Sequence, residues 1–180
     1  MARRAIAVVG MPGSGKGTFC DVAKGYGWNV ISFGDISRET TKRELERAEG
    51  AFAVADMADR LRKERGPDWI AREAVKRAEG VNGNVCFDDP RTAEEIYYLR
   101  QEYPSIKLVG MLSEDEDRYS RLLDRARWDD KGTLDDIRKK DQKGGAWGIP
   151  KLLELADYRI GNDGTLEDLK AKSSELLGTL

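Results

Sequence analysis

A glycine-rich stretch that ends in a lysine carries the clearest chemistry in this 180-residue sequence. It reads Gly10-Met11-Pro12-Gly13-Ser14-Gly15-Lys16-Gly17-Thr18 and directly follows the apolar residues 5–9. An apolar strand, a glycine-rich loop and a helix start match the pattern G-x-x-x-x-G-K-[ST], whose inward-turned backbone N–H groups bind phosphates. The positive end of the helix and the lysine ammonium add charge at the same place. We therefore predict an ATP site formed by Gly13, Ser14, Gly15, Lys16, Gly17 and Thr18.

One position departs from this pattern. Gly17 follows Lys16 where the pattern has a serine or threonine, and the hydroxyl comes one residue later, at Thr18. We expect Thr18 to help hold a magnesium ion, because hydroxyl oxygens complete the metal shell beside bound phosphates. The alternative is a glycine-rich turn with a lysine there by chance. The preceding strand and the length of the match favour the P-loop.

Two aspartates follow another short apolar run, at residues 85–87. An acid at the end of a strand that faces a P-loop holds magnesium directly or through water, so we assign Asp88 to the metal. The alternative for Asp88 and for its neighbour Asp89 is a helix cap or a turn. The sequence has no histidine, which excludes imidazole catalysis and indicates a hard ion held by oxygens.

A third group consists of arginines at positions 118, 121, 125 and 127, of which the first three share one face of a helix. Phosphoryl transfer is catalysed mainly by positioning and charge neutralisation, so converging arginines are what this reaction requires. The alternative is a solvated helix face, paired with Asp117 and Asp124.

Alternating strands and helices must position these groups. Further strands are predicted at 29–33, 106–112 and 157–160. Helices are predicted at 16–24, about 36–49, 51–79 with a break at 66–67, and 92–103 with a capping box of Thr92 and Glu95. Further helices are predicted at 113–126 with a capping box of Ser113 and Glu116, after 133 with an interruption at 144–145, at 149–155, and after 165, where Thr165 and Asp168 form the cap. This alternation predicts an α/β fold with a parallel sheet, helices on both faces, and ligands beyond the carboxyl ends of the strands.

Composition narrows the class of protein. The length predicts one domain, and no apolar run approaches the ~20 residues that span a bilayer. Since the N-terminal stretch is too short for a signal peptide, we expect a cytoplasmic protein. A net charge of −2 argues against a broad nucleic-acid surface. The two cysteines, Cys20 and Cys86, are expected to be buried and reduced.

The form Gly-x-Pro-Gly-x-Gly-Lys-Gly-Thr resembles the P-loop of adenylate kinases and related nucleoside monophosphate kinases. Residues 33–38, Phe-Gly-Asp-Ile-Ser-Arg, are similar to the Thr-Gly-Asp-x-x-Arg stretch of these enzymes. The resemblance implies that Arg38 binds the phosphate of the acceptor and that Asp35 lies near the metal. Phe33 departs from the threonine and belongs to the implied acceptor site.

Residues 88–91, Asp-Asp-Pro-Arg, resemble a shortened Asp-Gly-Phe-Pro-Arg stretch of the same kinases. The resemblance makes Arg91 the second acceptor arginine, with Asp89 in place of a glycine. The spacing of Arg121 and Arg125 matches the start of the kinase lid, which implies that both stabilise the transferring phosphoryl group. Residues 156–164 are similar to the end of dephospho-coenzyme A kinases, which implies that Asn162 lies by the adenine of ATP.

Over its whole length the chain resembles P-loop kinases described as adenylate-kinase-like or dephospho-coenzyme-A-kinase-related. The resemblance implies a three-layer P-loop kinase fold with a five-stranded parallel sheet. It divides the single domain, residues 1–180, into a core (1–33, 81–126 and 148–180), a helical acceptor-binding insertion (about 34–80) and a short lid (about 127–147).

The function predicted from these residues is an ATP- and magnesium-dependent phosphotransferase that acts on a nucleotide-type acceptor, first of all a nucleoside monophosphate. The expected catalytic residues are Lys16, Asp35, Asp88, Arg121 and Arg125. Two alternatives remain. One is a kinase of a hydroxyl, on dephospho-coenzyme A or on a 5-hydroxymethyl pyrimidine, free or in DNA, with Asp35 or Asp89 as base. The other is a regulatory P-loop NTPase without a small acceptor.

Overall fold

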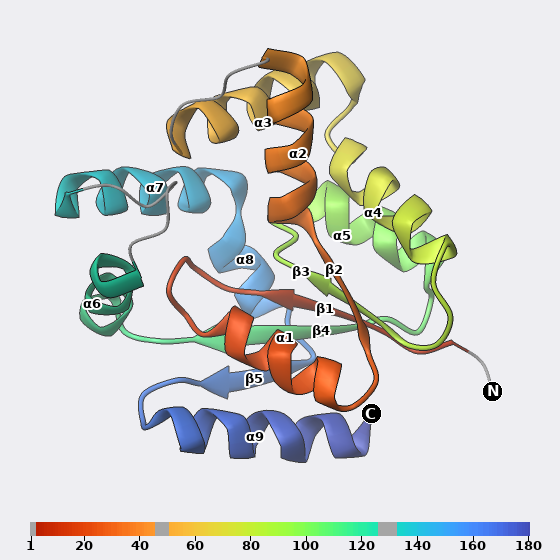
Figure 1. Ribbon diagram of the computed structural model, residues 1–180, viewed down its shortest axis with the longest axis vertical. Helices are drawn as coiled ribbons and strands as arrows, with labels where there is room; N and C mark the ends of the chain where they lie inside the picture. Colours follow the sequence, from red (N-terminus) through yellow and green to blue (C-terminus); the bar gives the residue numbers. More distant parts are fainter. Residues whose placement is uncertain (1–2, 46–50, 126–132) are drawn as a thin grey trace.

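A parallel sheet forms the centre of the computed structural model, which describes residues 3–45, 51–125 and 133–180 (Figure 1). In these residues five strands pair in the order β2-β3-β1-β4-β5, and every neighbouring pair is parallel. The strands are β1 Ala5–Val9, β2 Asn29–Ser32, β3 Val85–Asp88, β4 Lys107–Leu112 and β5 Tyr158–Gly161. The predicted α/β class and parallel sheet are confirmed.

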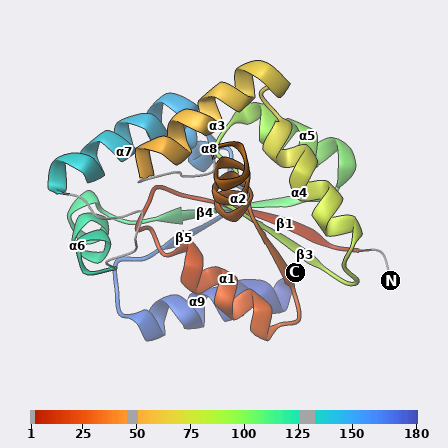
Figure 2. The ribbon, with the colours of Figure 1, turned by 45° about the horizontal axis from the view of Figure 1, so that its top comes forward.

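Helices cover both faces of this sheet (Figures 1 and 2). Helices α1 and α9 pack on one face, whereas α4, α5 and α8 pack on the other. The helices are α1 Lys16–Gly25, α2 Phe33–Leu45, α3 Ala51–Arg65, α4 Trp69–Glu79, α5 Ala93–Glu102, α6 Asp115–Arg125, α7 Leu134–Trp147, α8 Ile149–Glu154 and α9 Leu166–Thr179. Among the described residues, no helix is long and apolar enough to cross a membrane.

The central strand β1 shows why an uninterrupted apolar run precedes the loop. Ala7 and Val9 belong to the core under α4, α5 and α8, whereas Ile6 and Val8 belong to the core under α1 and α9. A parallel strand between two helical layers is buried on both faces, so its residues do not alternate between apolar and polar. This burial fixes the position from which the P-loop leaves the sheet.

The carboxyl ends of the strands meet at one edge, as predicted. Helices α2 and α3 rise from this edge, and α7 lies beside α3 (Figure 2). Lys143 on α7 forms an ion pair with Asp56 on α3. The elements that follow β2 and β4 therefore meet above the loop that follows β1.

Three local predictions are wrong. Phe33 begins α2 and does not end β2, because its buried ring packs edge-on against Phe87 instead of continuing the sheet. Helix α7 runs through residues 144–145 without interruption. It ends at Trp147, and the next residue, Gly148, is the C-cap, whose φ of 98° suits glycine. Ser113 forms no capping box with Glu116, since α6 begins at Asp115 and the Ser113 hydroxyl bonds to the Asn162 carbonyl instead.

Candidate functional site

The loop between β1 and α1 has the backbone geometry of an anion nest. Gly13 and Gly15 adopt φ of 79° and 103°, a left-handed conformation that side chains resist. The Lys16 ammonium folds back and donates to the carbonyl oxygens of Gly10 (2.6 Å) and Met11 (3.1 Å). This arrangement leaves the backbone N–H groups at the start of α1 available to phosphates.

The neighbours of Gly15 also leave no room for a side chain at this position. A Cβ there would lie 2.7 Å from Asn162 Nδ2 and 2.9 Å from Leu169 Cδ2. Gly17, in contrast, is exposed, and a Cβ there would meet nothing within 4 Å. Packing therefore does not explain why glycine stands at position 17, where the general pattern has serine or threonine.

Replacing Gly15 with alanine should lower the free energy of unfolding by about 2–4 kcal/mol, because left-handed strain and overpacking add. Gly17→Ala is the matched control, and we expect it to change that free energy by less than about 1 kcal/mol. Urea unfolding at pH 7 without nucleotide measures both. Equal stabilities of the two variants would contradict the described loop.

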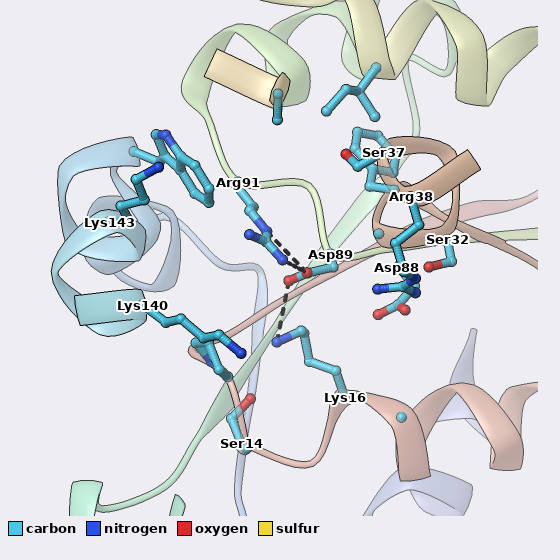
Figure 3. A pocket seen from close by; sticks show the side chains of 18 of the residues that line it. Ser14, Lys16, Ser32, Ser37, Arg38, Asp88, Asp89, Arg91, Lys140 and Lys143 are labelled. Atoms are coloured by element: carbon cyan, nitrogen blue, oxygen red, sulfur yellow. Dashed lines mark hydrogen bonds and ion pairs between the residues drawn. The ribbon is translucent and has the colours of Figure 1, made fainter. Parts of the chain in front are cut away.

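A cavity of about 480 Å³ lies between the loop, the end of β3, helix α2, helix α3 and helix α7 (Figure 3). All six predicted nucleotide-binding residues of the loop line this cavity, and so do Phe33, Arg38, Asp88, Asp89, Arg91 and Arg121. The fold thus brings the predicted donor and acceptor residues to one site.

Asp89 is the central anion of this cavity (Figure 3). Its carboxylate lies 3.3 Å from the Lys16 ammonium and accepts hydrogen bonds from Arg91 Nε (3.1 Å) and Nη2 (2.6 Å). Burial would raise the pKa of Asp89, but the charges of Arg91 and Lys16 outweigh burial and hold this pKa below its ordinary value. Asp89 also has a φ of 70°, which is rare for a side-chain-bearing residue. An ionised carboxylate therefore joins the phosphate-site lysine to the expected acceptor arginine.

Asp88 has the opposite electrostatics. Burial and the neighbouring Asp89 charge raise its pKa to about 6. Its Oδ1 is buried and has no hydrogen-bond partner among the described residues. The hydrogen bond with Cys86 and burial raise the pKa of the neighbouring Cys20, so that Cys20 is a protonated thiol. Both cysteines are free and buried, as expected.

The raised pKa of Asp88 predicts a pH-dependent effect on stability. Above about pH 6 the ionised Asp88 carboxylate destabilises the folded state relative to the unfolded state. This destabilisation decreases as the pH falls from about 6 toward the unfolded pKa of 3.8. Asp88→Asn should therefore stabilise the metal-free protein by about 1–3 kcal/mol at pH 8 and by less at pH 5. Asp89→Asn is the control with the opposite sign, because the pKa of Asp89 is lowered. Urea unfolding in EDTA decides, and an Asp88→Asn variant less stable than the wild type at pH 8 would refute the assignment.

Two predicted residues lie beside the cavity and do not line it. Asp35 is exposed at the start of α2, where its carboxylate accepts a hydrogen bond from Arg38. Asn162 is buried, and its side-chain amide donates to the Ser14 carbonyl (3.1 Å). In the structure Asp35 thus orients an arginine and Asn162 braces the P-loop.

Arg118 braces the loop from the other side. Its buried guanidinium donates to the Pro12 carbonyl (2.8 Å) and pairs with Asp115 and with Asp141 on α7. Burial would lower the pKa of Arg118, but the hydrogen bonds with Asp141 and Asp115 raise it. The solvated helix face considered for this cluster therefore does not describe Arg118, which ties α7 to the P-loop.

Arg121 lines the cavity on the loop side. It donates to Ser113 Oγ (2.8 Å), the Asn162 carbonyl (3.0 Å) and the Gly13 carbonyl (3.2 Å). To contact a transferring phosphoryl group it would exchange these partners for phosphate oxygens. Arg125 ends α6, and its side chain lies outside the described part of the chain, as does residue 127 of the same predicted cluster.

Four residues of α3 and α7 that line the cavity were not predicted from the sequence: Arg62, Lys140, Lys143 and Trp147. Glu95, predicted only as a helix-capping residue, is fully buried and forms that cap with Thr92. It also accepts from the Arg62 side chain (2.8 Å) and from the Arg91 backbone N–H (2.6 Å). No local motif marks these residues, because helix α3 and helix α7 meet only in the folded chain.

The strand order, the helices on both faces and the lysine-bearing loop after β1 define a P-loop nucleotide-binding protein of kinase-like fold. The family model described as "AAA domain" matches residues 9–138. The chain is similar in structure to TT1252 from Thermus thermophilus, with a TM-score of 0.68 and 18% sequence identity. The superposition covers 100% of this chain and 99% of the TT1252 chain. At this identity the likeness supports the fold.

Sequence relatives define the family more narrowly. The UPF0200 protein of Methanoregula boonei is 36% identical over 97% of this chain and 96% of its own length. The relative from Methanoculleus marisnigri is 35% identical over 97% and 95%, and UPF0200 protein Ta0179 of Thermoplasma acidophilum is 35% identical over 96% and 94%. The chain belongs to the AAA domain family and to the UPF0200 proteins.

Proposed function

We propose that this protein is an ATP- and magnesium-dependent phosphotransferase that moves the γ-phosphoryl group to a nucleotide-type acceptor, with a nucleoside monophosphate as the first candidate. One observation carries the proposal. A single cavity holds the P-loop lysine at one end and arginines from α2, α3 and the β3 end at the other, with Asp89 between Lys16 and Arg91. A nucleotide hydrolase needs the first end of this cavity but has no use for the second.

At the donor end, the loop N–H groups and Lys16 bind the phosphates of ATP. The unpaired, buried Asp88 Oδ1 fits a magnesium ion, with Thr18 at the cavity wall. No cluster of three or more His, Cys, Asp or Glu side chains occurs in the described ranges, so phosphate oxygens and water would supply the other ligands. Magnesium bound there would neutralise charge on the phosphates.

At the acceptor end, Arg38 and Arg91 bind the anionic group of the acceptor. The acceptor phosphate replaces Asp89 as the partner of Arg91, and a bidentate guanidinium orients it. A phosphate acceptor is already an anionic nucleophile and needs no base. Arg121 and Arg125 then stabilise the group in transit, and α7 acts as a lid. The first residues of the predicted lid, 127–132, lie outside the described part of the chain.

A second candidate function is a kinase of a hydroxyl on a nucleotide-type molecule, and one observation favours it. The carboxylate of Asp89 is held ionised between the two ends of the cavity. A hydroxyl acceptor would place its O–H beside this carboxylate, which could accept the proton, whereas an acceptor phosphate must displace it.

A screen with [γ-³²P]ATP and magnesium tests both candidates. The panel contains all ribo- and deoxynucleoside monophosphates, dephospho-coenzyme A and hydroxymethylated DNA. Labelled nucleoside diphosphate supports the first candidate, and a labelled phosphate ester supports the second. Activity on DNA should fall steeply with salt. Label found only as inorganic phosphate across the panel would refute both and leave a regulatory NTPase.

A further inference from the structure

Trp147, the last residue of α7, lies at the acceptor end of the cavity. Its indole N–H donates to Asp59 Oδ1 on α3 at 2.8 Å. The guanidinium carbons of Arg62 and Arg91 lie 4.9 Å and 5.0 Å from the centre of its ring. One side chain of the predicted lid therefore contacts both the α3 helix and the expected acceptor arginine.

These contacts differ from ordinary core packing. Trp28 and Trp69 are 4% and 5% exposed and belong to the apolar cores, whereas Trp147 is half-buried and lines the cavity. A guanidinium at this distance from an indole face is attracted by the ring electrons, and tryptophan offers the strongest such face. The ring therefore holds cations, as an aromatic recognition surface does.

The contacts form a continuous path across the site. Asp59 holds the indole, the indole holds Arg91, and Arg91 donates to Asp89, which pairs with Lys16. Arg91 is thus fixed on two sides, by the ring and by the carboxylate. When an acceptor anion takes the place of Asp89, the ring is the contact that still restrains the guanidinium.

We infer that Trp147 is a positioning residue for the acceptor: it orients Arg91 and, with Arg62, links the C-terminal end of the lid helix α7 to acceptor binding. This inference rests on the proposed function. It assigns the acceptor end a cation–π cluster, made of Trp147, Arg62 and Arg91, that recognises an anionic group. The rest of α7 contacts the P-loop side separately, through the Asp141–Arg118 pair.

The first test does not require turnover. Phenylglyoxal modifies accessible guanidinium groups, and mass spectrometry reports the rate at each arginine. In Trp147→Leu we expect labelling of Arg91 and Arg62 to rise several-fold, while Arg121, which lines the same cavity away from the ring, stays unchanged. Trp147→Phe keeps a weaker ring and loses the bond to Asp59, so about a twofold rise is expected, and this variant serves if the leucine variant does not fold. Equal labelling of Arg91 in the wild type and the folded variants overturns the inference, and so does a parallel rise at Arg121.

The second test separates acceptor from donor binding. Calorimetry measures AMP, as the acceptor probe, on protein saturated with magnesium and a non-hydrolysable ATP analogue, and measures the analogue by itself. Trp147→Leu should weaken AMP binding about tenfold and leave analogue binding within twofold. Equal weakening of both would overturn the inference. If the wild type binds no AMP, the proposed function loses this acceptor, and the labelling result still decides the role of Trp147.

Discussion

Replacing Lys16 with methionine is expected to lower phosphoryl transfer by about 10³-fold while the protein still folds. The ammonium contacts the Gly10 and Met11 carbonyls and the Asp89 carboxylate, so it lies beside the loop that we expect to bind phosphates. Methionine keeps the length of the side chain and removes the charge. Because Arg91 still pairs with Asp89 in this variant, the buried carboxylate is not left without a partner.

Lys24→Met is the matched control for this change. Lys24 lies on the same helix α1, but it is exposed and pairs with Asp21 at 2.9 Å. Transfer rates and ATP affinities of both variants are measured beside their unfolding curves. The loop has no role in phosphate binding if the Lys16 and Lys24 variants keep transfer rates within threefold of each other.

Replacing Arg91 with methionine should lower transfer by about 10²–10³-fold and leave basal ATP hydrolysis unchanged. The residue contacts Asp89 and the Trp147 ring at the end of the cavity away from the loop. On the proposed function its charge acts on the acceptor and not on the phosphates of ATP. The double variant with Arg38→Met should lose transfer altogether and still hydrolyse ATP.

Arg100→Met, at an exposed position of α5, controls for the loss of one positive charge. Transfer and hydrolysis are followed in the same reaction, with labelled acceptor and labelled phosphate separated by chromatography. A regulatory NTPase predicts a different result, in which Arg91→Met changes neither rate or lowers both equally.

The sequence predicted the parts of this molecule that local chemistry determines. The P-loop, the strand ends and the capping boxes of α5 and α9 depend on residues a few positions apart, and each forms as expected. The boundary at Phe33 was predicted wrongly because its apolar side chain continues the pattern of β2, although tertiary packing against Phe87 places it in a helix.

The end of the cavity away from the P-loop, which we propose as the acceptor end, was predicted only in part. Arg38 and Arg91 follow strands and could be located by their motifs, whereas Arg62 and Trp147 lie 85 residues apart, inside helices whose patterns indicate only a helix. Arg118 illustrates the same limit. It belongs to a surface-like cluster of arginines in sequence, yet Asp141 and the Pro12 carbonyl bury it.

A single-turnover experiment tests the central claim most directly. Protein in excess over [γ-³²P]ATP is mixed with magnesium and the acceptor panel, and the label is followed in the wild type and in the Arg38→Met/Arg91→Met variant. The proposed function predicts that the wild type places the label on an organic acceptor, whereas the variant releases it as inorganic phosphate at the basal rate. The same distribution of label in both proteins would contradict an acceptor site opposite Lys16.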